Sequence, residues 1–285
     1  MHTSTPNCRV CGNQHQTRIG DLPLYLPGGQ APGDLLKCDV CGTWARSVNF
    51  DDPEIRTHFN VTSYTVPERE ECMRSARVEF FRSIIDLASR FVHLPPSGLR
   101  VLDVGVAYGH LLELYHEAGA KCAAVEIVDR LRDRLSARGY EAYRSAQDIP
   151  AGAVFDVITT IDSFYYFEQP EDLLRQLNPH LKPEGVLILR LTNRTPLLRL
   201  LRALRWPITN DIFGDVKHNF TYRGIRSLLQ RTSYRIERVI LGEKKKVVPL
   251  SKWMYYKLSL IASHLSGLKL TPGIILVCRR SAAAE

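Results

Sequence analysis

The sequence lacks any uninterrupted apolar run long enough to span a bilayer, and its first residues, MHTSTPN, lack a basic segment followed by an apolar one. Both absences argue against a transmembrane helix and a secretory signal, so we expect a cytoplasmic protein. With 285 residues, 45% of them hydrophobic, the chain has enough apolar side chains for one large domain or two.

Cysteine is scarce, with seven residues in the whole chain. An odd number without a secretory signal argues against a disulfide framework. Cys72, Cys122 and Cys278 stand alone in apolar or helical contexts, where reduced thiols are expected.

The other four cysteines form two C-x-x-C pairs near the N-terminus, each followed by a glycine. Four thiolates make a closed tetrahedral zinc site, which is structural because no coordination position is left for catalysis. A segment this short buries too little apolar surface to fold alone, so the metal would supply folding energy. We therefore predict a zinc ribbon over residues 1–50, with a redox dithiol pair as the alternative. The predicted ligands are Cys8, Cys11, Cys38 and Cys41.

The net charge of +8 is unevenly distributed along the chain. Residues 194–285 hold 18 Lys and Arg against 5 Asp and Glu, whereas the rest of the chain is net acidic. The predicted ribbon is near neutral, which makes it a poor footprint for nucleic acid. In residues 196–206, leucines and Trp206 form an apolar face beside three arginines. Such a helix can contact an acidic membrane or cover an anionic substrate, or it can simply pack on the core.

The stretch from Arg100 to Ile127 predicts a strand, a glycine turn, a helix and a second strand that ends on an acid. Glycines let the backbone approach a ligand, a helix N-terminus offers free N–H groups, and the Glu126 carboxylate can accept both hydroxyls of a ribose. This layout is typical of a nucleoside-binding βαβ unit. A dinucleotide fingerprint needs G-x-G-x-x-G, which is missing because three residues separate Gly105 from Gly109.

The same turn resembles motif I of the class I S-adenosylmethionine-dependent methyltransferases, which reads D-x-G-x-G-x-G after the first strand. Asp103, Gly105 and Gly109 match this pattern, and Ala107 stands at the middle glycine. An alanine fits there if its φ is negative, and its methyl group narrows the cleft. The resemblance implies that this turn holds the amino-acid end of S-adenosylmethionine.

The resemblance runs from about Leu99 to Asn193 and is closest to the small-molecule branch that includes ubiquinone-pathway O-methyltransferases. Residues 181–185 match the L-x-P-x-G passage of these enzymes. The resemblance implies further cofactor contacts: Glu126 at the ribose, Ile127 at the adenine face, Ser145 in the adenine loop, and Ile161 and Asp162 at the methionine portion.

The expected acid–base residues differ from that branch. The segment after the fourth strand is commonly Leu-Glu-His there and is Phe164-Tyr165-Tyr166 here, so the roles of the acid and the imidazole do not transfer. His218 falls where these enzymes bring a histidine towards the pocket, which makes it the first candidate base, with Tyr165 or Tyr166 assisting. A structural or surface histidine is the alternative. Tyr64 falls where related proteins place an aromatic ring over the cofactor.

The expected fold is an α/β Rossmann-like sheet of seven strands with helices on both faces, whose last strand is antiparallel as the resemblance implies. We divide the chain into a zinc ribbon (1–50), a helical lead-in (51–98) and a methyltransferase domain (99–285).

The expected function is methyl transfer from S-adenosylmethionine to a small, anionic or sugar-like molecule. Two alternatives stay open: a zinc-ribbon RNA base methyltransferase, favoured by the basic C-terminal third, and a non-catalytic, zinc-dependent interaction protein, favoured by Ala107 and the missing Glu-His.

Overall fold

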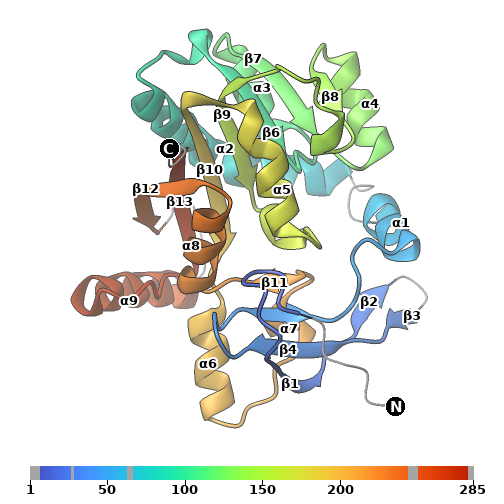
Figure 1. The fold of residues 1–285 in the computed structure, drawn as a ribbon, viewed down its shortest axis with the longest axis vertical. Helices are drawn as coiled ribbons and strands as arrows, with labels where there is room; N and C mark the ends of the chain where they lie inside the picture. The colour runs from blue at the N-terminus through green and yellow to red at the C-terminus, as the bar shows by residue number, and fades with distance from the viewer. Residues whose placement is uncertain (1–6, 27–28, 63–66, 243–249, 282–285) are drawn as a thin grey trace.

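A seven-stranded sheet forms the larger part of the molecule (Figure 1), whose computed structural model describes residues 7–26, 29–62, 67–242 and 250–281. Its strands, in spatial order, are β12 (Tyr234–Leu241), β13 (Gly273–Arg280), β10 (Leu181–Thr192), β9 (Phe155–Ile161), β6 (Arg100–Val104), β7 (Lys121–Val125) and β8 (Glu141–Tyr143). Strand β13 is antiparallel to β10 and β12, whereas the pairs from β10 to β8 are parallel. The predicted Rossmann-like sheet with an antiparallel last strand is confirmed.

Helices cover both faces of this sheet because its strands carry two alternating sets of apolar side chains. Val101 and Val157 belong to the core under α2 (Pro67–Val92) and α3 (His110–Glu117). Leu102 and Ile158 belong to the core under α5 (Pro170–Leu177) and α8 (Tyr222–Arg231). Helix α4 (Asp129–Ala137) adds Leu135 to the first of these cores.

A smaller sheet near the N-terminus contains a strand from the distant C-terminal half (Figure 1). Its strands, in order, are β1 (Gln16–Asp21), β4 (Asp34–Cys38), β5 (Trp44–Arg46) and β11 (His218–Asn219). In the last pair, His218 lies opposite Ala45 and Asn219 opposite Trp44. A hairpin of β2 (Leu24–Leu26) and β3 (Gly29–Ala31) lies beside it. The division into domains at residues 50 and 98 stays a prediction. The small sheet contains strands from both sides of these boundaries.

Buried polar contacts fix the small sheet to the rest of the molecule. The Arg46 guanidinium donates to the Asn210 side-chain oxygen at 2.7 Å and to the Gly214 carbonyl at 2.8 Å. Burial lowers the pKa of Arg46 to about 10, so the charge depends on these carbonyl partners. The Thr221 hydroxyl donates to the Cys41 carbonyl at 2.5 Å. The ribbon side chains and α8 accordingly share one apolar core.

The remaining helices are short, except for α9 near the C-terminus. These helices are α1 (Pro53–Thr62), α6 (Thr195–Ala203), α7 (Asn210–Phe213), α9 (Leu250–Ser266) and the 3₁₀ turns η1 (Pro96–Gly98), η2 (Ala146–Asp148), η3 (Phe164–Tyr166) and η4 (Asn178–His180). None of the helices that the structure describes is both long and apolar enough to cross a membrane.

Candidate functional site

The turn between β6 and α3 lies at the carboxyl edge of the large sheet, where open α/β folds bind ligands. Gly105 and Gly109 have φ angles of +75° and +83°, in the left-handed region that favours glycine. A Cβ at Gly105 would lie 2.4 Å from the Cβ of Ser163, so the two loops meet too closely for a side chain there. Ala107 has φ +53°, so the negative φ at which an alanine fits without strain is not what the structure shows. Its left-handed backbone costs about 1–2 kcal/mol.

Two buried carboxyl groups lie beside this turn. Glu126 accepts the Ala107 N–H on one oxygen at 2.8 Å and the Val128 N–H on the other at 2.9 Å. Each oxygen keeps a lone pair, which suits a ligand with two neighbouring hydroxyls. Asp103 accepts the Thr159 hydroxyl at 2.6 Å, and burial raises its pKa to about 7. Burial also raises the pKa of Glu126. The edge therefore holds two acids that are costly to ionise until a partner arrives.

The loop after β9 is held by charges from two other elements. One carboxylate oxygen of Asp162 pairs with Arg77 of α2 at 2.6 Å, and the other pairs with Arg190 of β10. Asp162 has φ +59°, and Ile161 just before it is buried in the core under α2. The Ser163 hydroxyl donates to the Val104 carbonyl at 2.5 Å, which links this loop to the end of β6. Asp162 is thus rigidly placed beside the glycine turn.

The two residues predicted to contact adenine differ in their surroundings. Ile127 is 39% exposed directly after Glu126, so its side chain is available to an apolar ligand face. The Ser145 hydroxyl and N–H both donate to the Asp148 carboxylate, at 2.8 and 2.9 Å. Ser145 therefore caps its own 3₁₀ turn. Tyr64 lies outside the described residues.

The tyrosines of η3 have separate partners, although their rings touch at a centroid distance of 4.9 Å. Tyr165 is buried, and burial together with the nearby Asp162 charge raises the pKa of its hydroxyl. The Tyr166 hydroxyl donates to Asp215 at 3.1 Å. The Tyr165 carbonyl accepts the Lys217 N–H at 3.1 Å, which joins η3 to the strand that carries His218.

His218 is 1% exposed, and neither ring nitrogen has a well-formed hydrogen bond among the described residues. Its ring lies 5.5 Å from that of Phe220, beside the backbone of Phe167 and Glu168. Burial, with the nearby charge of Lys217, lowers the pKa of His218 to about 3. The imidazole is therefore neutral at physiological pH and keeps an unshared lone pair.

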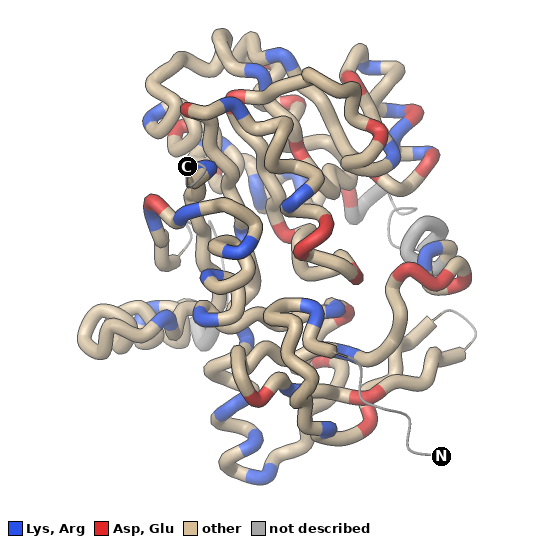
Figure 2. Tube along the Cα trace, viewed as in Figure 1, with Lys and Arg blue, Asp and Glu red and all other residues tan. Residues whose placement is uncertain are grey.

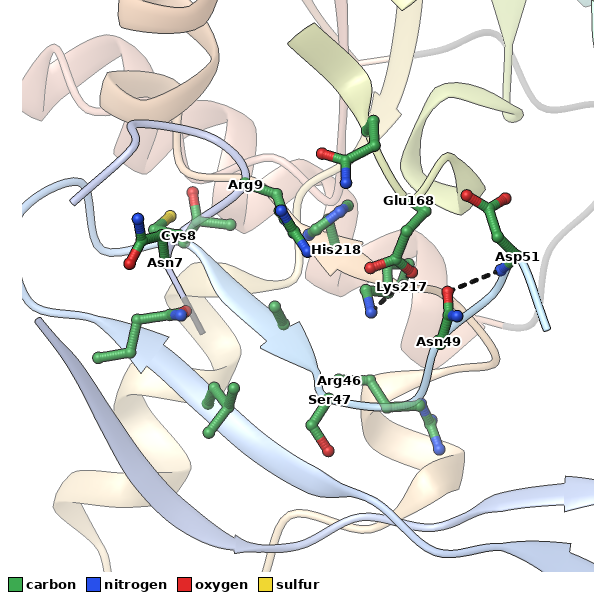
Figure 3. Close-up of a pocket in the computed structure, with 15 residues that line it drawn as sticks. Asn7, Cys8, Arg9, Arg46, Ser47, Asn49, Asp51, Glu168, Lys217 and His218 are labelled. Carbon is green, nitrogen blue, oxygen red and sulfur yellow. Dashed lines mark hydrogen bonds and ion pairs between the residues drawn. The ribbon is translucent and has the colours of Figure 1, made fainter. Parts of the chain in front are cut away.

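A cavity of about 400 Å³ lies between the small sheet and the loop after η3 (Figure 3). On one side Lys217, almost fully buried, pairs with Glu168 at 2.8 Å and donates to the Val48 carbonyl at 2.6 Å. Arg9 reaches from the N-terminal knuckle towards His218 and Lys217, and its charge lowers the pKa of both. The wall is completed by polar residues: Asn7, Gln16, Thr43, Ser47, Asn49, Asp51 and Gln169. The cavity is therefore lined mainly by polar and charged side chains.

The four ribbon cysteines come together in space. All four sulfurs lie within 4.8 Å of one another. The Sγ atoms of Cys8 and Cys41 are 3.8 Å apart, and those of Cys11 and Cys38 are 3.4 Å apart. A tetrahedral zinc ion with Zn–S bonds of about 2.3 Å places its sulfurs about 3.8 Å apart, so the cluster fits a zinc ribbon. The contact between Cys8 and Cys41 raises the pKa of the first thiol and lowers that of the second to about 5. Four thiolates this close would repel one another, and a cation bound between them would remove that repulsion.

Sequence reasoning missed the residues that hold the site from a distance. Arg77 lies in the predicted lead-in helix. Arg190 is a charged residue inside an apolar strand, and this pattern could have indicated a buried ion pair. The Glu168–Lys217 pair had no signal, because its partners are 49 positions apart.

A family model described as "methyltransferase domain" matches residues 75–239, more than half of the chain. Together with the fold and the glycine turn, this match defines the class of protein: the chain belongs to the class I S-adenosylmethionine-dependent methyltransferases.

Relatives of known function narrow the comparison to one group. The chain is 31% identical over 139 residues to the mitochondrial ubiquinone biosynthesis O-methyltransferase of Schizosaccharomyces pombe, covering 45% of this chain and 49% of that protein. It is 33% identical over 112 residues to the ubiquinone biosynthesis O-methyltransferase of Xanthomonas axonopodis pv. citri, covering 36% of this chain and 47% of the relative. The chain thus spans about half the length of the curated relatives it matches.

A solved structure shares the fold. The magnesium protoporphyrin IX methyltransferase of Synechocystis PCC 6803, with bound S-adenosylhomocysteine, superposes with a TM-score of 0.53 at 16% identity, covering 80% of this chain and 98% of that one.

Proposed function

We propose that this protein transfers a methyl group from S-adenosylmethionine to an oxygen, nitrogen or carbon of a small, anionic or sugar-like molecule bound in the cavity beneath the ribbon. The observation that carries this proposal is the position of the cavity. Glu168 and Gln169 line it, and they follow the loop of Asp162 by only a few residues. A cofactor at the glycine turn and an acceptor in the cavity would therefore share one edge of the sheet.

The cofactor would be held by residues at the carboxyl edge of the large sheet. Gly105, Ala107 and Gly109 would face the amino-acid end, Glu126 would accept the ribose hydroxyls, and Ile127 would lie on the adenine. The carboxyl groups of Asp103 and Asp162 and the side chain of Ile161 would border the methionine portion, with Ser145 at the adenine loop. S-adenosylmethionine supplies an electrophilic methyl group, so the chain's own task is to align the acceptor and remove a proton.

The acceptor side supports an anionic or hydroxyl-rich ligand. Lys217 is neutralised by Glu168, whereas the Arg9 charge lies beside it on the cavity wall. His218 is neutral, and its ring nitrogens have no well-formed hydrogen bond among the described residues, so it can accept a proton from an acceptor hydroxyl, with Tyr165 or Tyr166 assisting. An anionic acceptor would raise the pKa of His218 and make it a stronger base.

Zinc would hold the acceptor side together. Cys8 and Cys41 flank the segments that line the cavity, and Thr221 ties the second knuckle to the start of α8. A zinc ion bound by Cys8, Cys11, Cys38 and Cys41 would keep Arg9 and β5 in place without contacting the acceptor.

The test separates cofactor binding from catalysis. Calorimetric titration with S-adenosylhomocysteine should show binding to the intact protein, and Glu126→Ala should weaken it about 10- to 100-fold, because a buried carboxylate–hydroxyl pair is lost. Labelled S-adenosylmethionine with fractionated cell extract should then yield a methylated small molecule. No binding to the intact protein refutes the proposal. Labelled RNA, with an affinity that falls steeply with salt, would favour the nucleic-acid alternative.

A further inference from the structure

Helix α9 has its apolar and polar faces reversed. Its buried positions facing the body of the protein include two serines, with Ser263 only 2% exposed and Ser259 8% exposed. The opposite face carries large apolar side chains: Met254, Leu258, Ile261 and Leu265. Their spacing of four, three and four residues places them in one stripe along the helix. Leu258 is 62% exposed and Leu265 is 85% exposed.

The serine hydroxyls find their partners nearby in the chain. The Ser259 hydroxyl donates to the Tyr256 carbonyl at 2.9 Å, and the Ser263 hydroxyl donates to the Ser259 carbonyl at 2.6 Å. The Ser263 oxygen also accepts the Leu270 N–H at 3.0 Å, from the segment that follows the helix. Small serines therefore lie on the buried side, while Leu258 and Leu265 face outwards. Leaving four large apolar side chains in water forgoes on the order of 1.5–3 kcal/mol for each. Such a face is explained by something that covers it.

The charge around this stripe has one sign. Lys257 and His264 flank it, and Lys269 follows the helix. The sequence from residue 244 to residue 284 contains no Asp or Glu, and Figure 2 shows no acidic residue on α9. A second copy seated on the same face would bring lysines against lysines, which disfavours a symmetric dimer. An anionic partner fits instead.

The aromatic residues define the kind of anionic partner. Trp253 and Tyr255 are both exposed near the start of α9, and the Lys257 ammonium lies 5.6 Å from the Trp253 ring centroid. Exposed Trp and Tyr next to lysines and a leucine stripe is the composition of helices that lie in the headgroup region of a bilayer. Figure 1 shows α9 projecting from the side of the molecule.

We infer that α9 docks this protein on an anionic membrane surface, with Met254, Leu258, Ile261 and Leu265 in the acyl boundary and Lys257 at the headgroups. The inference does not depend on the acceptor. It predicts that the enzyme acts at a lipid surface, with its sheet edge held at a fixed distance from the bilayer.

Vesicle flotation of the full chain tests this inference. Phosphatidylcholine vesicles with about a third phosphatidylserine should carry the protein up the gradient, and vesicles without the anionic lipid should carry at least about 10-fold less. The double variant Leu258→Ser/Leu265→Ser should lose flotation by at least about 10-fold, since two buried leucines are removed from the lipid. Lys257→Glu should weaken it several-fold.

Three controls decide between outcomes. Leu94→Ser changes an exposed leucine after α2 and should float like the wild type. All variants should bind S-adenosylhomocysteine equally well, which shows that they are folded. The inference is overturned if the protein ignores anionic vesicles, if Leu200→Ser/Leu204→Ser on α6 abolishes flotation while the α9 variant does not, or if sedimentation shows a dimer that Leu258→Ser/Leu265→Ser dissociates.

Discussion

Two regions differ in how completely their polar groups are paired. One is the carboxyl edge of the large sheet around the glycine turn, called the cofactor edge below, and the other is the cavity between the small sheet and the loop after η3. At the cofactor edge, Glu126 accepts two backbone N–H groups and Asp162 pairs with two arginines. In the cavity, the ring nitrogens of the buried His218 have no well-formed hydrogen bond among the described residues. The first region is preorganised by its own bonds. The second leaves buried polar groups for a ligand to satisfy, and its geometry depends on the ribbon.

Removing the zinc ligands should give the largest difference between the two regions, because it should impair the cavity and leave the cofactor edge almost unchanged. Cys8→Ser/Cys38→Ser leaves two thiolates, too few for a closed structural site. Acceptor methylation should fall at least about 100-fold because β5, β11 and Arg9 lose their support. Affinity for S-adenosylhomocysteine should change less than about threefold. Elemental analysis should give one zinc per wild-type chain, and the exposed Cys72→Ser variant serves as the matched control. Full turnover by the variant without zinc would contradict the dependence of the cavity on the zinc ribbon.

Replacing His218 should affect the cavity alone. His218→Phe keeps a ring of similar size and removes the proton acceptor, so kcat should fall about 100-fold with unchanged cofactor affinity. Steady-state kinetics and calorimetry measure the two effects. His180→Phe is the matched control, since His180 Nδ1 pairs with the Ala153 carbonyl at 2.8 Å, away from the cavity. An unaltered kcat in His218→Phe would assign the base to another group.

Asp103 should make stability depend on pH at the cofactor edge. Burial raises its pKa to about 7 from 3.8, so the folded state favours the protonated form. This contribution is present at acid pH and is lost as the pH rises through about 7. Between pH 5 and 8 the wild type should lose at most about 3 kcal/mol relative to Asp103→Asn, which cannot ionise. Urea unfolding across this range measures the difference. Parallel curves for the two proteins would show that Asp103 ionises freely.

Ala107→Gly should give the smallest change. Glycine removes the strain of a φ of +53° but adds flexibility to the unfolded chain. The free energy of unfolding should therefore rise by about 0.5–1 kcal/mol. Thermal unfolding measures it, and affinity for S-adenosylhomocysteine should stay equal or improve. Ala118→Gly, at a φ of −82° after α3, should destabilise instead. A loss of stability in Ala107→Gly would mean that the alanine methyl packs favourably in the turn.

Local patterns were sufficient for the elements around the glycine turn. The strand, helix and second strand predicted over residues 100–127 are β6, α3 and β7. Glycine spacing, a strand that ends on an acid and a helix start are close together in the chain, so their geometry follows from backbone preferences. The negative φ at which an alanine fits is not found at Ala107, whose φ is +53° and whose N–H donates to Glu126, 19 positions further along the chain.

Long-range pairing decided the rest. Nothing near His218 predicts that its strand joins β5, since strand pairing at this separation is set by the shared core of the ribbon and α8. Helix α9 was not predicted either. Its apolar stripe has helical spacing, but only the tertiary structure shows that this stripe faces outwards.

By itself, then, the sequence determined the class of cofactor through its motif spacing, the four sulfurs of the ribbon, and the succession of strand, glycine turn, helix and strand over residues 100–127. The tertiary structure alone decided that His218 is buried, that Lys217 is neutralised by Glu168, and that a cavity lies between the small sheet and the loop after η3. Burial and pairing between segments far apart in the chain set these properties, because the charge and proton affinity of a side chain depend on what surrounds it in space.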